Sequence, residues 1–315
     1  MRDLLRALCL AALAALAGCD LEEITIVEIK DVVIAEIYVN LAKDASENEV
    51  RALLHGTVGG LGSILDRLVG VRIVVSRSDG LTLELAENEL EACLEPAGEE
   101  EEEPEIGEGI CFFADPAQTP ELSPGDLLEV VVTFADGGTI LGAARVPASF
   151  EIDGIPSTCR LDPDTLLPLL WSSSEGAWAY FNETSIIGLR EALSAEGIPV
   201  EDDPLTLLGL SVSNQDTTTV FPSEFGVFDR FDLDSDLSVR LQTGLPPETS
   251  AEVSITAVDG NFVNWARGGN FNPSGLVRVP SLRGDGTGVF GATVNRRFFL
   301  FSSDQMDGVP DCLIP

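Results

Sequence analysis

Short apolar runs separated by glycine and proline are the feature that most constrains how this chain can fold. The 315 residues include 30 Gly and 18 Pro, which punctuate runs rich in Val, Ile, Leu and Thr. Examples are residues 31–39, 71–75, 81–85, 127–134 and 139–146. Short runs of this kind, bounded by turn residues, are typical of β-strands. The sequence therefore predicts a mainly β chain, whose first half forms an antiparallel β-sandwich of seven or eight short strands.

The chain changes character at residues 154–168, where three prolines lie close together. We expect a domain boundary there, with a first domain over 19–153 and a second, mainly β domain over 154–315. In the second domain, we expect Ser185 to be the N-cap of a helix that runs through Glu196 and is terminated by Gly197. The expected strands are residues 176–181, 207–212, 238–241, 251–258, 275–279 and 297–301. The predicted fold is two antiparallel β-sandwich-like domains in tandem, the second with one or two short helices.

The first 18 residues have the parts of a secretory signal peptide. Arg2 and Arg6 precede an apolar stretch over 7–17, which is too short to cross a bilayer of ~30 Å as a helix. Residues 16–19 read Leu-Ala-Gly-Cys, which resembles the lipobox of bacterial lipoproteins. That resemblance implies cleavage before Cys19, diacylglycerol on its sulfur and usually a third acyl chain on its amino group. We expect a lipid-anchored protein of the cell envelope, at the outer membrane, although Asp20 resembles the inner-membrane retention signal of enteric bacteria.

The charge balance excludes one class of partner. With 53 acidic and 18 basic residues the net charge is −35, so nucleic-acid phosphates are repelled. A run of six glutamates over 99–105, interrupted by one proline, predicts a solvated loop. The acidity favours solubility, with divalent or cationic ligands as the functional alternative.

The cysteine count predicts disulfides. One of the six cysteines leaves with the signal peptide and Cys19 carries lipid, so four remain in an exported protein. Of the three possible pairings we expect Cys93–Cys111, which flank one insertion, and Cys159–Cys312, which ties the chain end to the second domain. No Cys-x-x-Cys spacing supports zinc instead.

Three segments near the C-terminus carry a family resemblance. Residues 259–265 (DGNFVNW), 268–275 (GGNFNPSG) and 280–291 (PSLRGDGTGVFG) resemble the end of an uncharacterised family of bacterial surface lipoproteins. The resemblance implies an N-terminal domain similar to carboxypeptidase-regulatory, transthyretin-like sandwiches, and no known reaction. Members are often associated with TonB-dependent outer-membrane receptors, so such a transporter is the implied partner.

No catalytic set is recognisable in the sequence. Residues 286–291 match G-x-G-x-x-G, but no helix pattern follows them, so we interpret these glycines as turn residues. His55 is the single histidine, it lies in an expected strand, and no G-x-S-x-G elbow accompanies it. We therefore expect a non-enzymatic binding or accessory protein. The alternatives are an exported hydrolase that uses carboxylates and a purely structural or adhesion module.

Two segments are candidate sites. Asp304, Asp307 and Asp311 lie in a segment that resembles half of a calcium repeat of thrombospondin type 3 modules, in a single copy, so Ca²⁺ is the one cofactor that the sequence suggests. Residues 232–236 have EF-hand-like Asp spacing, but a leucine follows where that loop requires glycine. The segment 261–271 combines aromatic faces with hydrogen-bonding groups, a mixture that favours recognition, although packing in a core is its alternative. The predicted ligand-binding residues are Phe262, Asn264, Trp265, Arg267 and Asn270.

Overall fold

The computed structural model describes residues 32–57, 63–93, 109–211, 213–225, 235–267 and 279–312. The signal peptide, Cys19 and the glutamate run at 99–105 lie outside these ranges, as do residues 230–234 and most of the expected strand 275–279. No helix in the described ranges combines the length and the hydropathy needed to cross a bilayer.

The prediction of a mainly β chain is confirmed. The strands of the first half are β1 (Val33–Leu41), β2 (Glu49–Gly56), β3 (Arg72–Arg77), β4 (Thr82–Asn88), β5 (Gly109–Ala114), β6 (Leu127–Thr133) and β7 (Thr139–Arg145). The strands of the second half are β8 (Thr158–Leu161), β9 (Leu167–Leu170), β10 (Ala179–Ile187), β11 (Leu205–Leu210), β12 (Thr218–Phe221), β13 (Thr249–Val258), β14 (Arg283–Gly284) and β15 (Thr287–Ser302).

The helices are short. The α-helices are α2 (Ser63–Leu68), α3 (Leu189–Ala192), α4 (Ser235–Leu241) and α5 (Gly260–Arg267). The 3₁₀ turns are η1 (Ala45–Glu47), η2 (Leu90–Ala92), η3 (Thr119–Glu121) and η4 (Ser194–Glu196).

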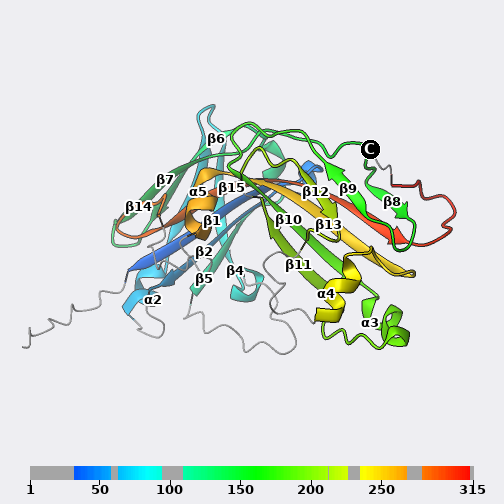
Figure 1. The fold of residues 1–315 in the computed structure, drawn as a ribbon. Helices are drawn as coiled ribbons and strands as arrows, with labels where there is room; N and C mark the ends of the chain where they lie inside the picture. The colour runs from blue at the N-terminus through cyan, green and yellow to red at the C-terminus, as the bar shows by residue number, and fades with distance from the viewer. Residues whose placement is uncertain are drawn as a thin grey trace, which may run out of the picture. The chain divides into compact units, whose positions relative to one another are not determined.

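Strands from both halves of the chain join one large sheet. Within the described residues it has 13 strands, in the order β11-β10-β13-β15-β1-β2-β5-β4-β3-β6-β7-β14, and β8 pairs with β15 off this path. A smaller sheet pairs β9 with β12. The connection between the halves is β15, which pairs in parallel with β1 at its start and antiparallel with β13 farther on (Figure 1). Residues 289–294 of β15 are continuously buried, as expected for a central strand covered on both faces.

The boundary that we predicted between residues 153 and 154 does not divide this sheet. Residues 31–315 form one compact unit, and a single hydrophobic cluster contains Ile37 and Leu128 from the first half together with Phe221 and Leu300 from the second. The reason is the β1–β15 pairing, which joins strands about 250 positions apart in the sequence.

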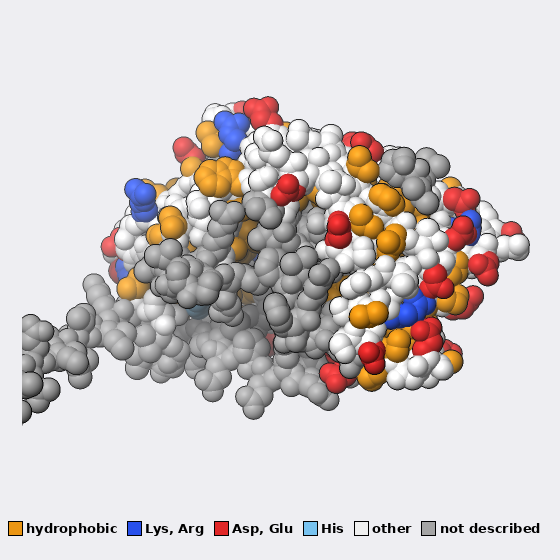
Figure 2. All heavy atoms as spheres, in the orientation of Figure 1, with side chains coloured by type: hydrophobic (Ala, Val, Ile, Leu, Met, Phe, Trp, Pro, Cys, Tyr) orange, Lys and Arg blue, Asp and Glu red, His pale blue; other side chains and the backbone are white. Residues whose placement is uncertain are grey.

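Acidic side chains are scattered over the face drawn in Figure 2, in keeping with the net charge of −35.

Two local predictions in the second half are wrong. Ser185 lies inside β10, between β11 and β13, and the helix begins only after Gly188. The helical end at Gly197 is as predicted, with a left-handed φ of 75°. Residues 238–241 belong to helix α4, whose Leu237 and Leu241 are both buried on one face.

Candidate functional site

Helix α5 comes from the segment in which we predicted ligand-binding residues. It begins directly after β13, and Asp259 caps it: a side-chain oxygen accepts a hydrogen bond of 2.9 Å from the backbone N–H of Phe262. Asp259 is 4% exposed. Its burial raises the pKa of the carboxyl to about 6, against the lowering effect of the backbone N–H groups that it accepts from.

Two contacts fix α5 against the large sheet. The side-chain amide of Asn261 donates to the carbonyl of Ala143 on β7 at 2.8 Å and to that of Phe290 on β15 at 2.9 Å. The ring of Phe262 lies between Tyr38 of β1 and Phe181 of β10, with ring centroids 5.5 and 5.4 Å away. The helix is therefore attached to strands from both halves of the chain.

Gly291 makes room for Phe262. It stands opposite Tyr38 in the β1–β15 register, and a Cβ on it would lie 3.3 Å from Cβ of Phe262 and 3.5 Å from the Tyr38 ring. Gly288 is required for another reason, since a Cβ there would lie 2.0 Å from the carbonyl oxygen of Ala35 and its φ is 139°. These two glycines belong to the segment in which we saw a G-x-G-x-x-G match. Gly288 lets β15 approach β1 closely, and Gly291 leaves space for the side chain of Phe262.

The strand under α5 presents polar groups to it. In β1 the residues at odd positions are buried and those at even positions are half-buried, so Glu36, Tyr38 and Asn40 share the outer face. The indole Nε1 of Trp265 donates to Oε1 of Glu36 at 3.2 Å. The hydroxyl of Tyr38 donates to Oε2 of the same carboxylate at 3.4 Å. The helix and the strand together hold the Glu36 carboxylate in place.

These groups surround a hollow of about 270 Å³, which we call the β1–β2 hollow. Its lining within the described residues is mixed: two charged groups, one amide, two aromatic rings, one leucine and one half-cystine. The lining residues are Glu36, Tyr38, Asn40, Arg51, Leu53, Cys93 and Phe262.

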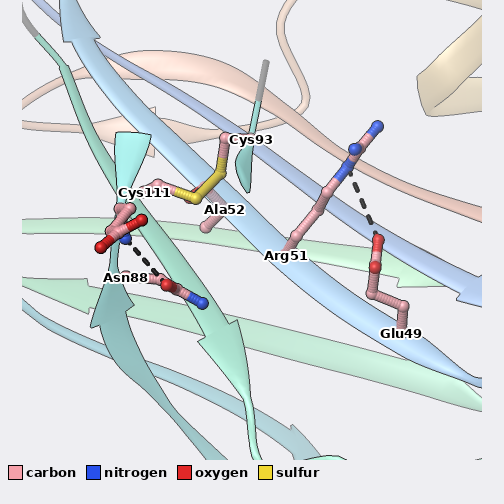
Figure 3. The surroundings of a disulfide bond; sticks show 7 residues. Glu49, Arg51, Ala52, Asn88, Cys93 and Cys111 are labelled. Atoms are coloured by element: carbon pink, nitrogen blue, oxygen red, sulfur yellow. Dashed lines mark hydrogen bonds and ion pairs between the residues drawn. A yellow bond between two sulfur atoms is a disulfide. The ribbon is translucent and has the colours of Figure 1, made fainter. Parts of the chain in front are cut away.

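The positively charged residue of the hollow lies on β2. Arg51 stands opposite Tyr38 in the β1–β2 register. In the described part of the chain its guanidinium has one ion pair, of 3.8 Å to Glu49. Figure 3 shows this pair on β2 beside the Cys93–Cys111 disulfide. The amide oxygen of Asn40 accepts a hydrogen bond of 2.9 Å from the hydroxyl of Thr293 on β15.

Both predicted disulfides are confirmed. The Sγ atoms of Cys93 and Cys111 are 2.07 Å apart, and those of Cys159 and Cys312 are 2.05 Å apart. The first disulfide holds Cys93 at the edge of the β1–β2 hollow, next to the carbonyl of Ala52. The second joins the end of the chain to β8.

The structure places the five predicted ligand-binding residues differently. Phe262 lines the hollow, Trp265 is buried and acts through Glu36, and Asn264 is half-buried on α5. The side chain of Arg267 and the whole of Asn270 lie outside the described residues. The strand residues of the hollow were not predicted from the sequence. Polar residues that alternate with apolar ones along these strands were the available signal. The sequence does not show the strand pairing that places them under α5.

Two of the three predicted calcium residues, Asp311 and Asp304, contact an arginine. Asp311 pairs with Arg160 at 2.5 Å, and Arg160 also donates to the backbone carbonyl of Asp304. Within the described ranges, no group of three or more His, Cys, Asp or Glu side chains could hold a metal ion. Calcium binding by Asp304, Asp307 and Asp311 stays a prediction.

Another hollow is larger but chemically poorer. It measures about 570 Å³ and its lining includes Ile155, Pro156 and Pro310. Its one charged lining residue in the described chain, Asp311, is already paired with Arg160. His55 lies on the outer face of β2 with Nδ1 2.9 Å from the carbonyl of Gly56, and it does not line the β1–β2 hollow. The smaller hollow is the better candidate, because polar, charged and aromatic groups converge there.

Comparison with known proteins adds little to this geometry. No family model matches the sequence, and no curated protein matches it. Among solved structures, the chain is similar to the fibronectin(III)-like modules of Clostridium thermocellum CbhA, at 9% identity and a TM-score of 0.22. That match covers 87% of this chain and 94% of the other. A likeness of this size carries no argument about function.

Proposed function

We propose that this protein is a non-enzymatic, lipid-anchored component of the bacterial envelope that binds a small ligand in the β1–β2 hollow. It would do so beside an outer-membrane transporter, as the resemblance to surface lipoproteins implies. The observation that carries the proposal is the convergence of Glu36, Arg51, Tyr38 and Phe262 on one hollow. Few, oriented polar groups beside aromatic rings are typical of small-molecule sites.

The lining of the hollow favours binding over glycoside hydrolysis. Both forms of that reaction use two carboxyl groups that flank the scissile bond. In the described chain one carboxylate, Glu36, lines the β1–β2 hollow, and it accepts hydrogen bonds from Trp265 and Tyr38. A carboxylate held in this way can orient a ligand without a second acid.

The anchor and the partner are tested in cells with the full chain. Wild type and Cys19→Ala are expressed with a C-terminal tag, the inner and outer membranes are separated, and co-purifying proteins are identified after solubilisation. We expect wild type in the outer-membrane fraction together with a TonB-dependent receptor, and Cys19→Ala outside the membrane fraction. Membrane association that survives Cys19→Ala contradicts the anchor, and a wild-type sample without any outer-membrane partner contradicts the transport role.

The binding site is tested with the purified protein. Thermal unfolding is followed in the presence of amino acids, neutral sugars, acidic sugars and short peptides, for wild type and for Phe262→Ala. At least one class should raise the unfolding temperature of wild type and have a smaller effect on Phe262→Ala, because a ligand that binds only the folded state stabilises it. Phe299→Ala is the control, since Phe299 is 42% exposed and does not line the hollow. No stabilisation by any class would overturn the proposal of a ligand site in this hollow.

A further inference from the structure

We propose that the exposed face of Trp178 is a binding platform for a neutral glycan, onto which one pyranose ring of the sugar chain stacks. Trp178 directly precedes β10 and does not line the β1–β2 hollow, so the inference is independent of the ligand of that hollow. Trp178 is 55% exposed, whereas the other two tryptophans of the chain, Trp171 and Trp265, are 3% and 8% exposed.

The indole of Trp178 is held against the protein by one face. A Cβ on Gly260 would lie 2.7 Å from Cε2 of the indole and 3.0 Å from both Cδ2 and Nε1. Because Cε2 and Cδ2 are the atoms that fuse the two rings and have no free edge, Gly260 must lie over a face of the indole. A glycine at the start of α5 therefore lets the ring lie flat against the helix, and the opposite face is left to the solvent.

The backbone that carries the ring is also fixed. The N–H of Trp178 donates to the carbonyl of Val258 on β13 at 2.8 Å. The carbonyl of Ala177 accepts a hydrogen bond of 3.1 Å from Nδ2 of Asn214. A group that is ordered before the ligand arrives loses little conformational entropy on binding. Trp178 therefore offers a rigid flat surface to a ligand.

Polar groups flank the ring. The segment before it contacts Arg145 at the end of β7, since a Cβ on Gly176 would lie 3.6 Å from Cδ of Arg145. Both Arg145 and Asn214 are exposed. Guanidinium and amide N–H groups donate to hydroxyls, and an amide oxygen accepts from them. An aromatic face with such groups at its margin complements a pyranose, whose ring C–H groups form an apolar face and whose hydroxyls lie around its rim.

The shape and the charge of the protein select the class of ligand. Trp178 lines neither the β1–β2 hollow nor the larger hollow of about 570 Å³. A ligand on its ring lies across an open surface, which suits a chain-like molecule better than an enclosed small one. The net charge of −35 opposes an anionic polymer, and it also opposes a second copy of this chain, which carries the same charge. A neutral glycan meets no such repulsion.

The test measures the retardation of the purified chain in native gels that contain a soluble polysaccharide. The neutral panel is a β-glucan, an α-glucan, a xylan and a galactomannan, and polygalacturonate is the anionic counterpart. The proteins are wild type, Trp178→Ala, Trp178→Phe, Phe262→Ala and Phe299→Ala. Phe299→Ala is the matched control, because Phe299 on β15 is an aromatic residue of comparable exposure, 42%. Unfolding curves verify that each variant is folded.

We expect at least one neutral polysaccharide to retard wild type, Phe262→Ala and Phe299→Ala equally. Trp178→Ala should bind it at least about 10-fold more weakly, as for the loss of a central aromatic contact. Trp178→Phe should retain part of the binding, because it keeps a flat ring. The same polysaccharide should protect the fluorescence of wild type from quenching by acrylamide, because Trp178 is the exposed one of the three tryptophans.

The inference is overturned if no neutral polysaccharide retards wild type, if Trp178→Ala leaves the retardation unchanged, or if polygalacturonate alone is effective. Self-association of wild type that Trp178→Ala abolishes, measured by sedimentation velocity, also overturns it, since the ring would then belong to an interface between copies. Glycan binding that Phe262→Ala abolishes and Trp178→Ala does not would assign the sugar to the β1–β2 hollow. That result overturns this inference and supports the proposed function.

Discussion

Replacement of Asp259 by asparagine should stabilise the protein at neutral pH. The buried carboxyl has its pKa raised to about 6 from an ordinary value of 3.8, chiefly because burial penalises the charged form. A group with a raised folded-state pKa stabilises the fold fully below its unfolded pKa, and that contribution is lost as pH rises through the folded value. Asparagine is neutral at every pH and keeps an oxygen that can cap α5, so it retains the cap without the buried charge.

The size of the effect follows from the shift. A rise of about two pKa units corresponds to roughly 3 kcal/mol, at 1.36 kcal/mol per unit. A carboxylate at a helix N-terminus also gains about 0.3–1 kcal/mol from the helix dipole, which asparagine gives up. We therefore expect Asp259→Asn to be more stable than wild type by about 1–3 kcal/mol at pH 7.5, and by close to zero at pH 4.

Urea unfolding of the two proteins from pH 4 to pH 8 measures this difference directly. The difference should grow between pH 4 and pH 6 and level off above. Asp44→Asn is the matched control of opposite sign, because Asp44 caps η1 in solvent and its pKa is lowered by hydrogen bonds from Ser46. Asp44→Asn should lower the free energy of unfolding at neutral pH, and this loss should become smaller as the pH falls. A constant difference for Asp259→Asn, or destabilisation that increases with pH, would refute the reasoning.

Two further predictions concern the scaffold of the site. Replacing both cysteines of the Cys159–Cys312 disulfide by serine should cost about 5 kcal/mol in urea unfolding, against about 3 kcal/mol for Cys93–Cys111, because they close loops of 153 and 18 residues; equal losses would contradict the loop-entropy account. Gly291→Ala should lower the free energy of unfolding by about 1–3 kcal/mol, because its Cβ would lie 3.3 Å from Cβ of Phe262 and 3.4 Å from a ring carbon of the same side chain. Gly209→Ala is its control, because a Cβ there would have no contact nearer than 3.6 Å. An equal loss of unfolding free energy in both variants would show that contact with Phe262 is not the cause.

The strands of the first half were predictable because their local pattern agrees with their environment. In β1 and in the first half of β4, apolar residues largely alternate with polar ones, and the structure buries the apolar set. Where local pattern and tertiary pairing disagree, the prediction was wrong. Ser185 has a good capping side chain, but β11 and β13 pair on both sides of it and extend the strand to Ile187. The last four residues of helix α4 were predicted as a strand, although Leu237 and Leu241, which the helix buries on one face, are spaced four apart as in a helix.

The candidate site was harder to predict than the fold for a physical reason. One of its residues, Phe262, was identified from the chemistry of its segment. Apart from Cys93, the others lie on β1 and β2, and nothing in their local sequence indicates that α5 covers them. That neighbourhood depends on the parallel pairing of β1 with β15, and pairings so distant in sequence leave no local pattern.

The dependence of the site on the β1–β15 pairing also links ligand binding to the folding of the sheet. The outward-facing residues of β1 and β2 line the β1–β2 hollow together with Phe262 of α5, and α5 is held against the sheet by the space at Gly291 and by the carbonyl of Phe290 on β15. The loop that closes when β1 meets β15 spans about 250 residues, so its entropy must be offset by the many contacts of a central, buried strand. Destabilising β15 at a position far from the hollow should therefore weaken binding together with folding. A change at Arg51 should weaken binding alone, since its side chain lies on the outer face of β2 and its ion pair with Glu49 is long and partly exposed.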